Sequence, residues 1–364
     1  MLTIYSEEAP RELVEFCERF VQCKDIPRFI LGRNEYAKSI AGIVDISGYI
    51  DDFTDEKTFL GKPIVKVEDV PANSMVVSTS TLKPISALNR LKSFNLECID
   101  YFSFRKYAGI DVQNIGFWDR FEVDLKENWE KYQYIYDLLQ DDRSKDIFSN
   151  IINFRISGNL NFMKDFAYAI EEQYFEEFLF YKSSGEVFAD VGCYDGKTSL
   201  EFIKRCPYYK SIHAFEPDMT NLNNARRNLR GQSNIFFYQT GLAECKKTLK
   251  FDSTCSSASK INENGNSEIE VDMLDSIVKE PISFIKMDIE GAEKEAILGA
   301  QYHIKNDYPK LAICVYHRFD DLWKIPAQVF KIRKDYSLFL RHYTEGIDET
   351  VMFFIPKVTT QVLK

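Results

Sequence analysis

The second half of the chain carries three short motifs that place acids and glycines at the ends of expected strands. The first is DVGCYDGKT at 190–198, the second is FEP at 215–217 and the third is KMDIEGAE at 286–293. The carboxyl ends of parallel strands meet at one edge of an open α/β sheet, and ligands bind in the crevice outside that edge. The three motifs therefore predict one ligand site that contains several carboxylates.

The first motif predicts a cofactor-binding turn between a strand and a helix. A dinucleotide turn would read GxGxxG, whereas this turn reads DxGxxxG and contains two carboxylates. Carboxylates repel a pyrophosphate but attract the ammonium and sulfonium groups of S-adenosylmethionine. A tight structural turn is the alternative. The residues expected to contact this cofactor are Asp190, Gly192, Cys193, Asp195, Gly196 and Thr198.

The acid of the second motif, Glu216, follows the glycine turn by about 20 residues, the spacing at which nucleotide-binding folds hold ribose hydroxyls. We expect Glu216 and Pro217 to line the cofactor site. The alternative is an acid favoured by the dipole at the start of the next helix. Asp218 is expected to cap that helix.

The third motif crowds Lys286, Asp288, Glu290 and Glu293 at the end of a central strand. A structural ion pair of Lys286 with a carboxylate is one reading of this crowding. We expect Asp288 beside the cofactor and, with Glu290, among the catalytic candidates. Carboxylates could also hold a divalent ion, but the sequence offers no clear ligand set, and no metal is expected.

A histidine follows another expected strand in the segment AICVYHRFDDLW at 312–323. An attacking group that must lose a proton benefits from a base, and histidine has the ordinary pKa closest to that task. A purely structural histidine is the alternative. We therefore rank the candidate bases as His317 first, Asp288 second and Glu290 third.

The segments around these motifs alternate between apolar runs and amphipathic stretches, which predicts a doubly wound, mostly parallel α/β sheet with helices on both faces. Residues 183–364 are interpreted as this domain. Strands are expected at 187–191, 212–215, 235–239, 283–287, 311–316 and 351–355, and helices at 198–205, 221–229 and 292–303.

The first third of the chain shows the same alternation on a smaller scale and predicts a small Rossmann-like α/β domain at 1–110. Residues 111–182 predict a helical connector or lid, which includes the aromatic stretch 162–181. Strands of the small domain are expected at 28–31, 48–50, 75–80 and 97–102, with a helix at 35–44.

Composition limits the classes of function. The 364 residues are 45% hydrophobic and carry a net charge of −10, which disfavours nucleic acid and a polybasic membrane anchor as partners. Without a signal peptide or an apolar run of membrane-spanning length, a cytoplasmic location is expected. The eight cysteines show no CxxC pair and are expected to be free thiols. The oligomeric state stays open, and a homo-oligomer is one of the options.

Residues 187 to about 356 resemble the FkbM family of class I S-adenosylmethionine-dependent methyltransferases, and KMDIEGAE is the most specific of the shared motifs. The resemblance implies methyl transfer to an oxygen, typically a hydroxyl of a sugar or a glycosylated natural product. It places the cofactor against Asp190, Gly192, Gly196 and Glu216. It also implies that Gly241 or Leu242 reaches the adenine, in the absence of the usual acidic partner.

The N-terminal domain is similar, more weakly, to small domains that bind nucleotide-sugars in some sugar-modifying enzymes. Its turn ILGRNEYAKSI lacks the second and third glycines of GxGxxG, so a structural or dimerising role is the alternative. The leading hypothesis is a methyltransferase acting on a hydroxyl of a surface polysaccharide or its nucleotide-sugar precursor. A nucleotide-sugar oxidoreductase and a non-catalytic glycan-binding scaffold are the alternatives.

Overall fold

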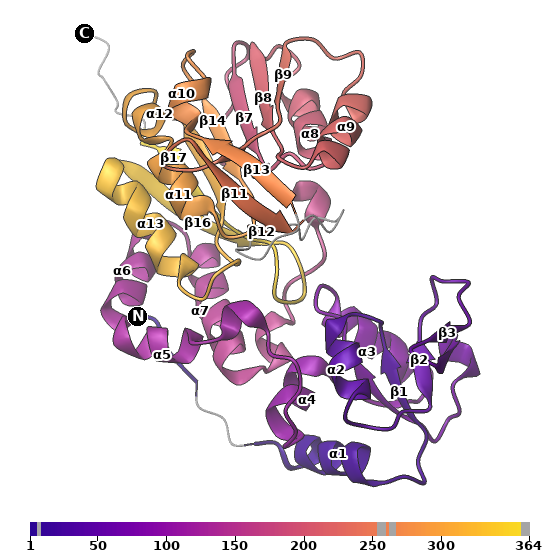
Figure 1. Ribbon diagram of the computed structural model, residues 1–364. Coiled ribbons are helices and arrows are strands. Elements are labelled where there is room, and N and C mark those ends of the chain that lie inside the picture. Colours follow the sequence, from indigo (N-terminus) through magenta and orange to yellow (C-terminus); the bar gives the residue numbers. More distant parts are fainter. Residues whose placement is uncertain (6–8, 253–259, 262–266, 358–364) are drawn as a thin grey trace.

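The computed structural model describes residues 1–5, 9–252, 260–261 and 267–357. It contains a small N-terminal sheet and a large C-terminal sheet, with the connector helices beside the large one (Figure 1). Seven cysteines of the described part are free thiols, and Cys255 lies outside the described residues. No helix in the described ranges is long and apolar enough to cross a membrane.

The small sheet has the strand order β3-β4-β2-β1-β5-β6, in which only β3 runs antiparallel to its neighbour. Its buried strands are flanked by helices, as the alternation in the sequence predicts. The strands are β1 (Arg28–Leu31), β2 (Gly48–Ile50), β3 (Thr58–Phe59), β4 (Lys62–Val65), β5 (Met75–Ser78) and β6 (Glu97–Asp100). The helices are α1 (Arg11–Gln22), α2 (Glu35–Ala41), α3 (Pro84–Ser93) and α4 (Tyr101–Tyr107).

The large sheet has the order β16-β17-β15-β14-β7-β8-β9. Five neighbouring strands of this sheet are parallel to one another: β15, β14, β7, β8 and β9. Strand β17 runs antiparallel to both β15 and β16. All six expected strands are present, and β16 was not expected. The strands are β7 (Val187–Val191), β8 (Ser211–Phe215), β9 (Ile235–Tyr238), β14 (Phe284–Met287), β15 (Lys310–Cys314), β16 (Tyr336–His342) and β17 (Thr350–Pro356).

Helices cover both faces of the large sheet. On one face, α8 (Lys197–Arg205) and α9 (Met219–Asn228) follow the first two strands. The expected helix at 292–303 is instead two helices, α11 (Glu293–Leu298) and α12 (Gln301–Asn306), separated at Gly299. A Cβ at Gly299 would lie 2.0 Å from the carbonyl oxygen of Ala243, so this position packs directly on another backbone. The other face also carries α10 (Leu274–Ile277) and α13 (Asp321–Ile332).

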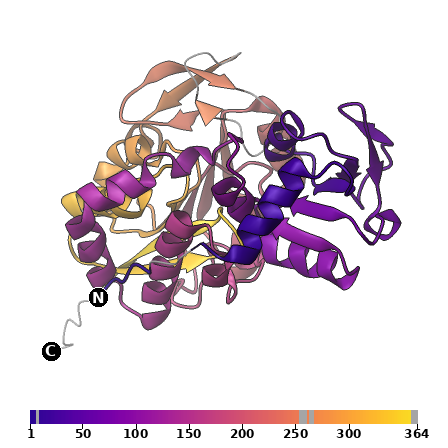
Figure 2. The same cartoon turned by 90° about the horizontal axis from the view of Figure 1, so that it is seen from below.

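A second small sheet precedes β14 and was not expected from the sequence. Its order is β10-β13-β11-β12, and Figure 2 shows it standing at the margin of the large domain. Its strands are β10 (Gly241–Leu242), β11 (Lys247–Asp252), β12 (Lys260–Ile261) and β13 (Ser267–Asp272).

The connector is helical only in its first part. The helices α5 (Phe121–Glu127), α6 (Trp129–Leu138) and α7 (Asp142–Ser157) pack into the core of the large sheet. The prediction of a helix over 162–181 is wrong, because residues 158–186 contain only two 3-10 turns, η3 (Leu160–Met163) and η4 (Ile170–Glu172). Gly158, at φ +69°, ends α7 in the left-handed region.

The aromatic side chains of this irregular segment pack individually against the large sheet. Phe178 stacks on Phe339 of β16, while Tyr174 and Leu179 are buried in the core that contains Phe188. The rings thus make separate tertiary contacts, and they do not form one face of a helix as their spacing predicted.

Candidate functional site

A cavity of about 250 Å³ lies at the carboxyl ends of β7, β8 and β14. The strand order reverses between β7 and β14, so this is the switch point at which open α/β sheets bind ligands. Nine of the residues expected at the cofactor site line the cavity: Gly192, Cys193, Asp195, Thr198, Glu216, Pro217, Gly241, Leu242 and Asp288.

Asp190 and Gly196, also expected there, do not line the cavity. Gly196 caps α8 at φ +80°, and a Cβ at this position would lie 3.1 Å from Cα of Ala225 on α9. Asp190 is fully buried beneath the turn, where it accepts a hydrogen bond from Ser199 at 2.7 Å. Both residues therefore support the turn from the side that faces away from the cavity.

The side chain of Lys286 on β14 interacts with the end of the neighbouring strand β7 at the bottom of the cavity. Its ammonium lies 3.3 Å from the Asp190 carboxylate and donates to the carbonyl of Gly192 at 2.5 Å. Burial would lower the pKa of Lys286, but Asp190 and Asp288 raise it above its ordinary value. The structural ion pair considered for Lys286 is thus present, and it supports the glycine turn.

The turn itself requires glycine at position 192. Gly192 has φ +78°, and a Cβ there would lie 1.9 Å from the carbonyl oxygen of Asp288. This close approach brings the turn after β7 against the strand end of β14. The acids of the first and third motifs are consequently held at one edge.

Glu216 is buried at the end of β8 and points at two backbone N–H groups. Its carboxylate accepts from Tyr194 at 3.2 Å and from Asp218 at 2.9 Å. Burial raises the pKa of Glu216 to about 7. Asp218 caps α9 by accepting from the N–H of Asn221, as expected. The carboxylate of Glu216 lines the cavity, where further hydroxyl donors could reach it.

The outer wall of the cavity is apolar. Leu242 is buried there, and Ile269 and Val271 of β13 stand beside it. A Cβ at Gly241 would lie 3.0 Å from Cγ1 of Val271, so a larger residue would press on this wall. A flat apolar ring fits such a surface better than a charged group does.

Asp288 is fixed from the opposite side by the connector. Its carboxylate accepts a hydrogen bond at 2.7 Å from the hydroxyl of Tyr174, which follows η4. Burial alone would raise the pKa of Asp288, but Lys286, His317 and Tyr174 lower it. The carboxylate is therefore held in its charged form.

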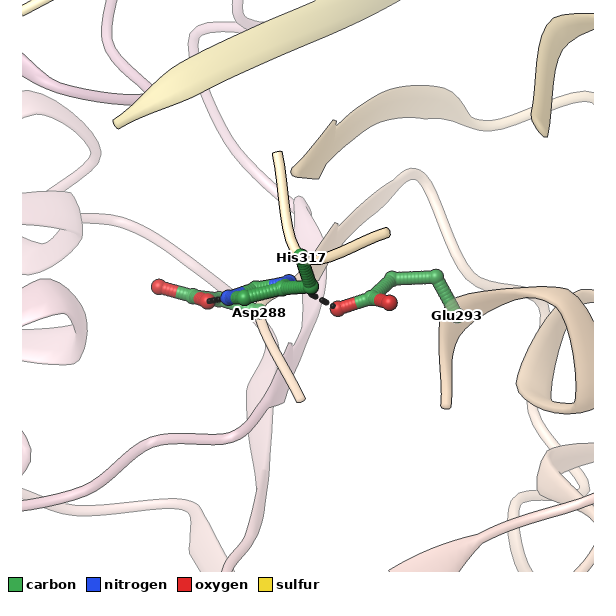
Figure 3. Close-up of side chains that lie close together, drawn as sticks. All are labelled: Asp288, Glu293 and His317. Atoms are coloured by element: carbon green, nitrogen blue, oxygen red, sulfur yellow. Dashed lines mark ion pairs between the residues drawn. The ribbon is translucent and has the colours of Figure 1, made fainter. Parts of the chain in front are cut away.

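His317 lies between two carboxylates (Figure 3). Its Nδ1 is 2.9 Å from Glu293 and its Nε2 is 3.4 Å from Asp288, while Glu290 is 3.8 Å from Nε2. Burial alone would lower the pKa of His317, but Glu293, Asp288 and Glu290 raise it well above the ordinary value. The imidazole consequently carries a proton at neutral pH. Asp288, Glu293 and His317 also have the spacing of metal ligands, with ligand atoms within 4.8 Å of one another.

Glu290 adopts the left-handed conformation at φ +54° in the turn before α11. Burial, opposed by His317 and assisted by Asp288 and Glu293, raises its pKa to about 7. Glu290 lines the first cavity and also a second one of about 810 Å³, which contains His317. Tyr316 and Glu349 are the other two residues shared by both cavities.

Several wall residues were not expected from the sequence. Gln173 and Tyr174 come from the segment predicted as helix, and Glu349 from the turn between β16 and β17. Gln173 donates to Glu349, and both side chains line this side of the cavity. No local motif marks these residues. Tyr316 could have been found, because it directly precedes His317 at a strand end.

At the corresponding turn of the small sheet, side chains of the small domain pack closely around Gly32. Gly32 has φ +104°, and a Cβ there would lie 2.6 Å from Oγ1 of Thr79. The side chain of Asn34 donates to the carbonyl of Thr79, and Arg33 pairs with Asp51.

Residues 190–344 match a family model described as the methyltransferase FkbM domain. No curated protein matches the chain. A solved structure, methyltransferase FkbM from Methylobacillus flagellatus KT, is similar with 23% identity and a TM-score of 0.75. The match covers 95% of this chain and 93% of that one. It confirms the expected Rossmann-like methyltransferase fold.

Two other solved structures are similar over about half of the chain. Aeropyrum pernix fibrillarin, solved with natively bound S-adenosyl-L-methionine, is 10% identical with a TM-score of 0.33, covering 48% of this chain and 67% of that one. An rRNA methylase from Streptococcus thermophilus is 17% identical with a TM-score of 0.31, covering 48% and 89%.

Proposed function

We propose that the chain is an S-adenosylmethionine-dependent O-methyltransferase that acts on a hydroxyl of a sugar or glycoconjugate, because residues 190–344 match the model of the methyltransferase FkbM domain. The observation that carries this proposal is the acid-lined cavity at the switch point of the large sheet. Among the described residues, its wall contains Asp195, Glu216, Asp288, Glu290 and Glu349 but only one cationic side chain, Lys286. A cationic cofactor satisfies this charge distribution.

The residues around the cavity fit the parts of the cofactor. Glu216 would accept hydroxyl donors of the ribose, and the apolar wall at Leu242 and Val271 would receive the adenine. Asp288, kept ionised by its neighbours, would face a cationic group. When bound, S-adenosylmethionine supplies a methyl group activated by its positive sulfur.

We assign the general base to Glu290 in place of His317. A base must be free to accept a proton near neutral pH, and His317 already carries one among its three carboxylate neighbours. Glu290 has a pKa of about 7 and lies where the two cavities meet. An acceptor hydroxyl in the second cavity would pass its proton to a carboxylate oxygen of Glu290.

His317 then acts as a positioning residue. Its imidazolium balances Asp288 and Glu293, and it keeps the pKa of Glu290 from rising further. In this proposal the positive charge of protonated His317 balances the charges of the carboxylates, so the methyl transfer requires no divalent ion. The cytoplasmic location expected from the sequence remains part of the same proposal.

Calorimetry with S-adenosylhomocysteine and the full chain tests the cofactor assignment directly. We expect saturable binding with one site per chain. NAD⁺ serves as the control ligand, because a dinucleotide would bring its pyrophosphate against Asp195 and Glu216. Binding of NAD⁺ without binding of S-adenosylhomocysteine at millimolar concentration would reject the proposal in favour of an oxidoreductase.

A further inference from the structure

The second cavity is built from all three parts of the chain. Leu82 belongs to the small N-terminal domain, Gly116 and Phe117 to the connector, and His317 and its neighbours to the large domain. It opens beside the first cavity and shares the Glu290 wall with it. Any molecule in the second cavity would therefore contact both domains and lie next to the proposed cofactor.

A tight contact between the domains fixes this geometry. In the turn between β16 and β17, the N–H groups of Glu345 and Ile347 donate to the carbonyls of Leu82 and Thr81 at 3.0 and 3.2 Å. A Cβ at Gly346 would lie 1.7 Å from the carbonyl oxygen of Thr81. The N–H of Ser86 donates to the Glu345 carboxylate at 2.7 Å. The same turn carries Asp348 and Glu349 into the second cavity.

One side of the second cavity is cationic. It carries Lys294, Arg318 and Lys324, and the two lysines share one carboxylate, Asp320. Arg318 is exposed, and among the described residues its guanidinium has no hydrogen bond or ion-pair partner. Gly291 leaves room for the Arg318 side chain, since a Cβ there would lie 3.1 Å from Nε. An unpaired guanidinium at a cavity wall is suited to bind a carboxylate or phosphate.

The opposite side is suited to hydroxyl groups. Burial raises the pKa of Asp348 to about 6 and that of Glu349 to about 8, so at neutral pH Asp348 mainly accepts hydrogen bonds while Glu349 can both donate and accept them. Phe117 and Phe319 add aromatic surface to the wall. Aromatic faces together with carboxyl groups can hold a polyhydroxylated ring.

We propose that this cleft between the domains binds the acceptor, and that the acceptor sugar carries an anionic group held by Arg318 and Lys294. The inference rests on the proposed function and specifies its substrate class. The small domain contributes to acceptor binding through Leu82 and the contact at 81–86.

The test uses the full chain saturated with S-adenosylhomocysteine and three probes: glucose 1-phosphate, glucuronate and methyl glucoside. We expect an anionic probe to bind at least about tenfold more tightly than the neutral one, as a charge-assisted contact would give. Comparing the phosphate with the carboxylate shows which anion the cleft prefers. The double variant Arg318→Gln/Lys294→Gln should reduce this preference to below about threefold.

Two further variants complete the design. Lys331→Gln removes a positive charge from the exposed end of α13 and should leave the preference unchanged. Leu82→Glu adds an acid from the small domain and should weaken only the anionic probes. Equal binding of neutral and anionic probes, or binding of none, overturns the inference. If S-adenosylhomocysteine still binds in those samples, the proposed cofactor assignment survives this failure.

Discussion

Replacing Glu216 with glutamine should raise stability and lower cofactor affinity at the same time. Burial moves the pKa of Glu216 from its ordinary 4.5 to about 7, a difference worth about 3 kcal/mol. Because the folded-state pKa lies above the unfolded one, the ionised carboxylate destabilises the fold. This cost is absent below pH 4.5, grows between pH 4.5 and 7, and is complete above pH 7. Glutamine is neutral like the protonated acid and removes this cost, which makes the full value an upper bound because its NH2 group cannot accept one of the two N–H bonds.

We therefore expect Glu216→Gln to be more stable than the unchanged chain by up to about 3 kcal/mol at pH 8, and by little at pH 5. The measurement is the urea midpoint at both pH values. The same variant should bind S-adenosylhomocysteine roughly 10- to 150-fold more weakly at pH 8, because hydrogen bonds to a charged acceptor contribute about 1.5–3 kcal/mol. Calorimetry measures this loss.

Asp218→Asn is the matched control two residues along the chain. Asparagine caps a helix as well as aspartate does, and Asp218 does not line the cavity. Both stability and affinity should stay close to those of the unchanged chain. If Glu216→Gln instead lost stability at pH 8, the carboxylate would be required by the fold. Unchanged affinity would show that Glu216 does not hold the ribose.

The remaining predictions concern the base and the buried pair. Glu290→Gln should remove the rise in turnover between about pH 6 and 8 that a base with its pKa provides. His317→Gln removes a positive charge 3.8 Å from Glu290, so this rise should move upward by about one pH unit or more. Turnover should be unaffected by EDTA, and a loss of turnover in EDTA would show that a metal ion, and not the proton on His317, balances the carboxylates. If the rise in turnover with pH disappeared in His317→Gln but not in Glu290→Gln, histidine would be the base. Asp190→Asn leaves Lys286 buried without its partner and should lower the free energy of unfolding in urea by about 3–5 kcal/mol. The folded fraction should keep its affinity for S-adenosylhomocysteine. A loss of affinity without a loss of stability would show that Asp190 contacts the cofactor.

Much of the ligand site could be predicted because its signals are local. A glycine turn such as that at Gly192, or an acid such as Glu216, follows directly from a strand that the apolar pattern reveals. The rule that parallel strands align their carboxyl ends then brings these positions together without further information. Seven of the residues expected at the cofactor site line one cavity for this reason, and Gly241 and Leu242, which line it too, were expected from the family resemblance.

The helix predicted over 162–181 shows where local reasoning stops. The spacing of its aromatic residues is helical, but Phe178 and Tyr174 pack in separate places on the sheet. The second small sheet and β16 were missed for a related reason, since their pairing partners lie elsewhere in the chain. Long-range contacts decided these elements against the local pattern.

The sequence by itself determined the fold class, the order of the strand-end motifs and the acidic character of the site. Only the tertiary structure decided which groups carry protons there. His317 is charged because three carboxylates surround it, and Glu290 has a pKa near neutrality because it is buried. Asp348, Glu349 and Leu82 reach the site from distant turns. Burial and charge proximity are properties of packing, and no local pattern of residue types contains them.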